Sequence, residues 1–134
     1  MCHIPSDLQG NAGCLIVHEG RFLAARHLKK DKWNLPGGTY ERGESAQCTA
    51  QRETREELGV TVIVGELLRE HSNGFYLFRC TFAAGQFKAA YVVPRSGTND
   101  VSRIQWLLPD EIQAHDWRYP QRWPSIAALV QGQR

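Results

Sequence analysis

Residues 36–60 contain a sharp backbone break, followed by a segment with sequence signals for both ends of a helix. Pro36-Gly37-Gly38 interrupts regular structure, because proline lacks a backbone donor and glycine adopts conformations that other residues avoid. Ser45 is a favourable N-cap, and Gly59 is of the residue type that most often follows the last turn of a helix. We therefore predict a loop and then a helix between Ser45 and Gly59, around which the rest of the chain must fold.

Three glutamates lie on one side of this predicted helix. At about 100° per residue, Glu53, Glu56 and Glu57 fall within an arc of roughly 100°. The neighbouring arc of the helix surface can pack against a sheet. The acidic side therefore lies at the boundary of the face that is expected to be buried. Two explanations are open: a solvated acidic face with salt bridges, or ligands for a hard divalent cation such as Mg²⁺.

The loop before the helix favours the metal explanation. Gly37 and Gly38 let the backbone come close to a metal or a phosphate, with carbonyl and amide groups available to it. Glu44 adds a fourth carboxylate just before the helix. A loop with close backbone access, joined to clustered carboxylates, indicates a site for a metal and phosphate groups.

The same stretch resembles the Nudix box, the signature of the Nudix hydrolase family. That signature is Gly, five residues, Glu, seven residues, Arg-Glu, an aliphatic residue, any residue, Glu-Glu, any residue, Gly and an aliphatic residue. The matching positions are Gly38, Glu44, Arg52, Glu53, Glu56, Glu57, Gly59 and Val60. The departure is Thr54, where an aliphatic residue is usual and whose methyl group can still pack. Seven fixed residues, each with a frequency of about 1 in 15, coincide by chance about once in 10⁶ such chains.

The resemblance implies an α/β fold, a Nudix-type α/β/α sandwich with a mixed β-sheet flanked by helices, formed by residues 1–134 as a single domain. It implies a pyrophosphohydrolase that cleaves a phosphoanhydride bond in a nucleoside diphosphate linked to another moiety. The substrate would be a nucleoside triphosphate, a nucleotide-sugar or a dinucleotide, and the cofactor Mg²⁺ or Mn²⁺. The alternative is a catalytically inactive Nudix-fold module that binds a nucleotide; lost box carboxylates would support it, and none is lost.

Site roles follow from the same resemblance. The expected metal ligands are Glu53, Glu56 and Glu57, together with the carbonyl group of Gly37 or Gly38. Phosphoanhydride cleavage also needs an activated water, and Glu53 or Glu56 is expected to take its proton.

The remaining site residues have open or indirect roles. Arg52 is expected to orient a box glutamate through a charge-assisted hydrogen bond. Glu44 either binds the metal through a water or holds the loop. Asp100, outside the box, is either a general base or a turn residue. The substrate phosphates are expected to contact Gly38 and Arg26, although Arg26 can equally be a surface residue.

Outside the box, the patterns predict strands and helices but no further site. Strands are predicted at 13–17, 21–25, 60–68, 75–82, 86–93 and 104–108, and helices at 110–115 and 124–130. The segment 117–124, with three aromatic residues, can stack on a nucleobase, close the core or form a dimer contact. The histidines at 18, 27, 71 and 115 are predicted to be surface or turn residues.

Composition indicates which partners the protein binds and in which cellular compartment it folds. A net charge of +2 is too small for a nucleic-acid footprint, and no stretch approaches the 18 apolar residues of a membrane span. The expected partner is a small nucleotide-like molecule, with a homodimer as the base-rate expectation. The four cysteines lack the close spacing of a zinc site and are predicted to be free thiols, which favours a reducing compartment, the cytoplasm.

Overall fold

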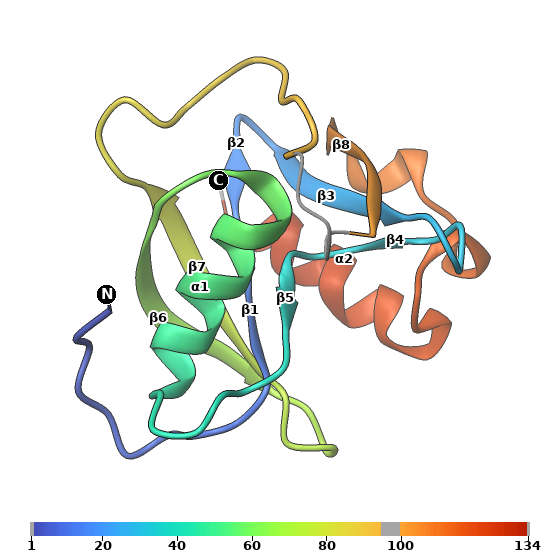
Figure 1. Cartoon of the computed structure of the whole chain (residues 1–134). Coiled ribbons are helices and arrows are strands. Elements are labelled where there is room, and N and C mark those ends of the chain that lie inside the picture. Colours follow the sequence, from blue (N-terminus) through green and yellow to red (C-terminus); the bar gives the residue numbers. More distant parts are fainter. Residues whose placement is uncertain (1, 95–99, 134) are drawn as a thin grey trace.

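The computed structural model describes residues 2–94 and 100–133, and Figure 1 shows how their helices and strands are arranged. The strands are β1 (Ala12–Leu15), β2 (Val17–His18), β3 (Arg21–His27), β4 (Trp33–Asn34), β5 (Gly37–Gly38), β6 (Val62–Glu70), β7 (Tyr76–Phe82) and β8 (Val101–Leu107). The helices are α1 (Ala46–Leu58) and α2 (Trp123–Gly132), and the 3₁₀ turns are η1 (Pro109–Glu111), η2 (Ala114–Asp116) and η3 (Pro120–Arg122).

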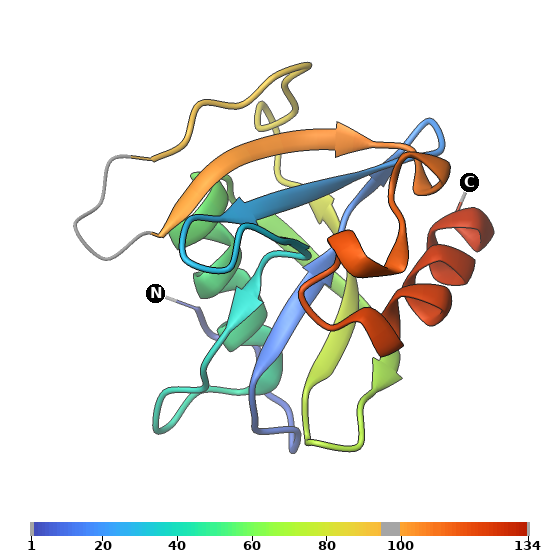
Figure 2. The same ribbon diagram turned by 90° about the vertical axis from the view of Figure 1, so that its right-hand side faces the viewer.

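Within the described ranges the strands form two sheets. The first has the order β5-β1-β7-β6, with β1 and β7 parallel and the other pairs antiparallel. In the second, β3 pairs with β2, β4 and β8, and every pair is antiparallel. Figure 2 shows β8 lying along β3. The β3–β8 pairing joins segments that are more than 70 residues apart and determines what lies beside the end of β3.

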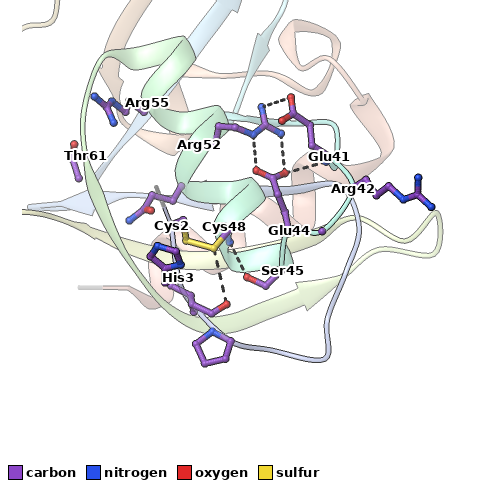
Figure 3. Close-up of a pocket in the computed structure, with 14 residues that line it drawn as sticks. Cys2, His3, Glu41, Arg42, Glu44, Ser45, Cys48, Arg52, Arg55 and Thr61 are labelled. Atoms are coloured by element: carbon purple, nitrogen blue, oxygen red, sulfur yellow. Dashed lines mark hydrogen bonds and ion pairs between the residues drawn. A yellow bond between two sulfur atoms is a disulfide. The ribbon is translucent and has the colours of Figure 1, made fainter.

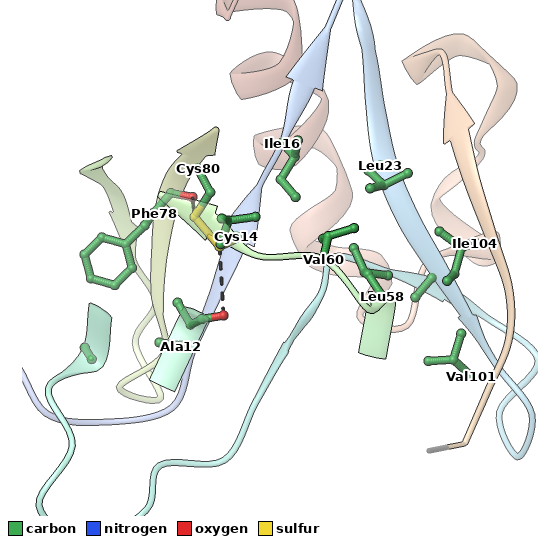
Figure 4. Close-up of a cluster of buried hydrophobic side chains, with 14 residues drawn as sticks. Ala12, Cys14, Ile16, Leu23, Leu58, Val60, Phe78, Cys80, Val101 and Ile104 are labelled. Atoms are coloured by element: carbon green, nitrogen blue, oxygen red, sulfur yellow. Dashed lines mark hydrogen bonds between the residues drawn. A yellow bond between two sulfur atoms is a disulfide. The ribbon is translucent and has the colours of Figure 1, made fainter. Parts of the chain in front are cut away.

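Both faces of the central strands are buried. Along β3, Leu23 points into a first apolar cluster and Phe22 into a second, and Cys14 and Leu15 divide in the same way along β1. The first cluster includes Ala50 of α1, and Figure 4 shows part of it. The second includes the buried residues of α2. The predicted α/β/α sandwich with a mixed sheet is therefore confirmed.

The predicted box helix is confirmed at both ends. The hydroxyl oxygen of Ser45 accepts a hydrogen bond from the Cys48 amide at 3.2 Å. Gly59 adopts a left-handed conformation (φ 72°), and its amide donates to the Arg55 carbonyl at 2.9 Å. Both ends therefore satisfy backbone groups that the helix leaves without partners.

Two predicted elements are wrong. Residues 86–93, all of them described, form no strand, and side chains bind both backbone groups of Lys88 in their middle. The Lys88 amide donates to the Tyr91 hydroxyl at 2.8 Å, and the Lys88 carbonyl accepts from Trp106 Nε1 at 3.0 Å. The predicted helix at 110–115 is replaced by η1 and η2, which are separated at Ile112, a buried residue in an extended conformation. The strands predicted elsewhere and the C-terminal helix are present, with shifted ends.

The prediction of free thiols is also wrong. All four cysteines, each within the described ranges, form disulfide bonds: Cys2 with Cys48, and Cys14 with Cys80. The second bond is buried between β1 and β7 and is visible in Figure 4. The separations of 46 and 66 residues hid these pairs from any search for closely spaced cysteines. The prediction of a cytoplasmic location rested partly on unpaired thiols and loses that part of its support.

The aromatic segment 117–124 belongs mainly to the core. The side chains of Trp117 and Trp123 are buried in the second cluster with their ring centroids 4.7 Å apart, while Tyr119 remains at the surface between two arginines. Of the three predicted roles, core closure is therefore the one that the two tryptophans fulfil. No helix among the described residues is both long enough and apolar enough to cross a lipid bilayer.

Candidate functional site

The box carboxylates open onto a cleft of about 220 Å³ between β5, α1 and the start of β8. Its lining residues come from three parts of the chain and include four carboxylates: Gly37, Gly38, Thr39, Glu53, Glu56, Glu57 and Asp100. The cleft therefore brings together all the predicted metal ligands and the predicted outside carboxylate.

The packing of α1 determines where its glutamates lie. Ala50, Thr54 and Leu58 are buried against the sheets, so the neighbouring stripe of the helix is held at the edge of the core. Glu53 and Glu57 lie on that stripe, one turn apart. Thr54 is fully buried, so the departure from the aliphatic pattern keeps the packing role of the position.

Glu57 is the most enclosed of the three carboxylates, with a side chain that is 14% exposed. Burial raises the pKa of this carboxyl group from 4.5 to about 8, and the Gly37 amide opposes the shift by donating to Oε1 at 2.9 Å. The nearby carboxylates of Glu53, Asp100 and Glu56 add to the increase. A carboxylate held in this way gains strongly from a cation beside it.

Glu53 lies close to the backbone of the loop. Burial raises the pKa of its carboxyl group, which the positive charge of Arg52 partly opposes. A methyl group added at Gly38 would collide with the Glu53 carboxylate. The absence of a side chain at Gly38 therefore lets this carboxylate approach β5.

Arg52 ties the loop to the helix. Its Nε and Nη2 atoms donate to the two carboxylate oxygens of Glu44 at 2.7 and 3.1 Å. Its Nη1 donates to Glu56 Oε1 at 2.9 Å, and Nη2 also donates to the Thr39 carbonyl at 2.7 Å. One guanidinium group thus connects Thr39, directly after β5, with Glu44 in the loop before α1 and with Glu56 on the helix.

Glu44 makes contacts that suit the loop-holding role. Beside Arg52, it accepts hydrogen bonds from the Thr49 hydroxyl at 2.9 Å and from the Glu41 amide at 3.0 Å. These hydrogen bonds, that of Arg52 first, hold the pKa of its carboxyl group below the ordinary value. Glu44 is outside the set of described residues that line the carboxylate cleft.

A larger groove of about 910 Å³ lies on a different face of α1, where Cys48, Arg52 and Arg55 project (Figure 3). The Cys2–Cys48 disulfide draws the N-terminal segment along this groove. Glu53, Glu56 and Glu57 project about 140°, 80° and 180° away around the helix from Cys48 and do not line the groove. The smaller cleft, and not this groove, holds the grouped carboxylates.

The Arg26 side chain contacts residues of its own strand pair and turn. Its Nε donates to Asp31 Oδ1 at 2.8 Å, and its guanidinium group lies 5.4 Å from the centre of the Trp33 ring. The hydrogen bond to Asp31 raises the pKa of the arginine, so the group stays charged. Arg26 is not among the described residues that line the cleft.

His27 is the site residue that sequence patterns missed. It was predicted to be a surface or turn residue, but its side chain is 16% exposed and contacts two carboxylates of the cleft. Nε2 lies 3.9 Å from Glu57 Oε2, and Nδ1 lies 3.3 Å from Asp100 Oδ1. Among the described residues, these three offer ligand atoms that all lie within 4.8 Å of one another. The β3–β8 pairing and the packing of α1 bring the three residues together, so no local signal could have identified them.

The chain is similar to several known proteins. A family model for the NUDIX domain matches residues 7–129. A MutT-like protein of Streptomyces ambofaciens is 33% identical over 106 residues, covering 75% of this chain and 64% of that protein. This chain thus spans less than two thirds of the length of that relative.

Two further matches cover more of the other protein. The phosphatase NudJ of Escherichia coli K12 is 29% identical over 128 residues, covering 90% of this chain and 82% of that protein. The crystal structure of a NUDIX hydrolase from Nitrosomonas europaea has a TM-score of 0.75 with 20% identity, covering 98% of this chain and 76% of that chain. The range that the family model matches contains every residue that lines the carboxylate cleft.

Proposed function

The chain belongs to the Nudix hydrolase family, and from this premise we propose that it hydrolyses a phosphoanhydride bond in a nucleoside diphosphate linked to another moiety. The observation that carries the proposal is the position of Glu53 and Glu57 against the β5 backbone, in a cleft that also contains Glu56 and Asp100. Clustered carboxylates beside accessible backbone suit a bound cation together with phosphate groups. The proposed catalytic unit is one domain formed by residues 1–134.

The donor chemistry of the cleft fits Mg²⁺ or Mn²⁺. Glu53 and Glu57 would hold the ion, with Glu56 and a carbonyl oxygen of Gly37 or Gly38 as further oxygen donors. Such an ion would neutralise charge on the phosphates and activate a water. The cost of burying Glu57 in ionised form supports this assignment, because a cation offsets that cost.

The protein groups around the cleft have distinct proposed tasks. The Gly37 amide fixes one oxygen of Glu57, and Arg52 positions Glu56 and the loop through Glu44. Glu53 or Glu56 would accept the proton of the water. Arg52 Nη1 lies beside both carboxylates, 2.9 Å from Glu56 Oε1 and 3.5 Å from Glu53 Oε1.

The test is product release from a panel of nucleoside triphosphates, nucleotide-sugars and dinucleotides, each with Mg²⁺ and with a chelator. We expect metal-dependent release of phosphate or pyrophosphate from at least one class. Glu57→Gln should lower the rate by at least about 100-fold, on the scale of losing a residue that stabilises the transition state. Glu66→Gln is the matched control, since that exposed carboxylate on β6 pairs with Arg79 outside the cleft.

A second function, binding without cleavage, is the alternative outcome of the same experiment. A folded protein that binds a nucleotide but turns over no member of the panel would be a Nudix-fold binding module. The intact set of box carboxylates favours the enzyme. A homodimer is also proposed, on base rates for soluble proteins alone.

A further inference from the structure

The end of β3 holds His27 beside the carboxylate cleft. Its amide donates to the Lys32 carbonyl at 3.0 Å, and the next amide, that of Leu28, donates to the Asp100 carbonyl at 2.7 Å. β3 and β8 also pair His27 with Val101. The backbone therefore fixes the position of the imidazole relative to Asp100, although the two residues are far apart in sequence.

The two nitrogen atoms of the imidazole face different carboxylates. At 3.3 Å, Nδ1 is within hydrogen-bonding distance of Asp100 Oδ1, so Asp100 selects the tautomer in which Nδ1 carries the proton. The lone pair of Nε2 is then directed to the side of Glu57, whose Oε2 is 3.9 Å away. The other oxygen of Glu57 accepts the Gly37 amide.

The distance between Nε2 and Oε2 is 3.9 Å, which exceeds the length of a direct hydrogen bond. Two tetrahedral ligands that each lie about 2.1 Å from a divalent transition metal are about 3.4 Å apart, so an approach of about 0.5 Å would bring both atoms to one ion. A carboxylate that holds a histidine in position for a metal is a recurring arrangement, and here Asp100 has that place.

We propose that His27 Nε2 is a nitrogen ligand of the divalent ion held by Glu57, with Asp100 as the residue that orients the imidazole. The proposal rests on the proposed function, because it assumes that the box carboxylates bind an ion. It adds a prediction about metal choice. Mg²⁺ prefers oxygen ligands, whereas an imidazole ligand favours later divalent transition metals such as Co²⁺, Ni²⁺ and Zn²⁺.

The test measures metal binding in the absence of substrate. Co²⁺ is the probe, because its visible absorption reports its ligands and its affinity can be titrated directly. Replacing His27 by Asn should raise the Co²⁺ dissociation constant at least about 10-fold, on the scale of losing a ligand or its partner, and should change the visible spectrum. The Mg²⁺ dissociation constant should change by less than about threefold. His115→Asn, at an exposed histidine on η2, is the matched control and should leave both ions unaffected.

A second measurement needs no variant. In the unaltered protein, Zn²⁺ should shift the nitrogen NMR resonance of His27 Nε2, with a smaller effect on Nδ1. Absence of that shift, at Zn²⁺ concentrations that saturate the protein, would overturn the assignment of the ligand even if the His27 variant failed to fold.

The outcomes separate this inference from the function on which it rests. If Glu57→Gln abolishes Co²⁺ binding but His27→Asn leaves affinity and spectrum unchanged, the imidazole is not a ligand and the proposed metal site stands. If neither substitution alters Co²⁺ binding, the ion does not bind at these carboxylates, and both proposals are wrong.

Discussion

Glu57 makes the stability of the metal-free protein depend on pH. Burial holds the pKa of this carboxyl group at about 8, against an ordinary value of 4.5. Below pH 4.5 the group is protonated in both the folded and the unfolded states, and its contribution to stability is complete. As the pH rises from 4.5 towards 8, the unfolded chain loses the proton while the folded chain retains it, so the free energy of unfolding falls.

The size of the effect follows from the difference in pKa. Each pH unit in this window costs about 1.4 kcal/mol, and the two pKa values predict a loss of about 2 to 3 kcal/mol between pH 5 and pH 7. Glutamine at position 57 is neutral at every pH and retains an oxygen that can accept the Gly37 amide. The free energy of unfolding of Glu57→Gln, minus that of the natural protein, should therefore increase by this amount over the same interval.

Denaturant unfolding at pH 5 and pH 7, with chelator present and the disulfides intact, measures that difference. Taking the difference between two proteins cancels the titration of shared groups that do not interact with Glu57, such as Glu44. Saturating Mg²⁺ at pH 7 should restore stability to the natural protein and have little effect on the variant, because a cation favours the ionised carboxylate. A difference that stays constant to within about 0.5 kcal/mol between the two pH values would refute the burial of an ionisable Glu57 as the cause.

Three further perturbations test the surrounding structure. In Arg52→Lys, the lysine cannot reproduce the paired hydrogen bonds to Glu44. The value of kcat/KM should therefore fall at least about 10-fold, and the free energy of unfolding should fall by about 1 to 3 kcal/mol. A variant with natural kinetics would contradict the positioning role of Arg52. Gly38→Ala should displace the Glu53 carboxylate, so titration calorimetry should show weaker Mg²⁺ binding with little loss of stability. Gly13→Ala is the contrasting variant: its added methyl group meets the Pro36 carbonyl oxygen, so it should mainly destabilise the fold. The two disulfides close loops of 46 and 66 residues, so their reduction should lower the free energy of unfolding by up to about 4 kcal/mol per bond. An unchanged denaturation midpoint in reductant would argue against the pairing.

Sequence patterns failed where a segment depends on distant partners. The segment 86–93 was predicted to be a strand, but the side chains of Tyr91 and Trp106 hydrogen-bond the backbone of Lys88, and the segment joins no sheet. The cysteines carry no spacing signal, because each bond joins residues that only strand and helix packing brings close. The role of His27 was missed for the same reason, since its partners lie 30 and 73 residues further along the chain.

The sequence by itself determined the box helix and the grouping of its carboxylates. Ser45 and Gly59 set its ends, and the helical repeat places Glu53, Glu56 and Glu57 on one side whatever the rest of the chain does. Local hydrogen bonds suffice for this, because each joins residues only a few positions apart. Tertiary structure alone decided that the carboxylates face Asp100 and His27 and that burial raises the pKa of Glu57. Those properties require β3, β8 and α1 to meet, and the free energy of that packing is distributed over a core drawn from nearly the whole chain.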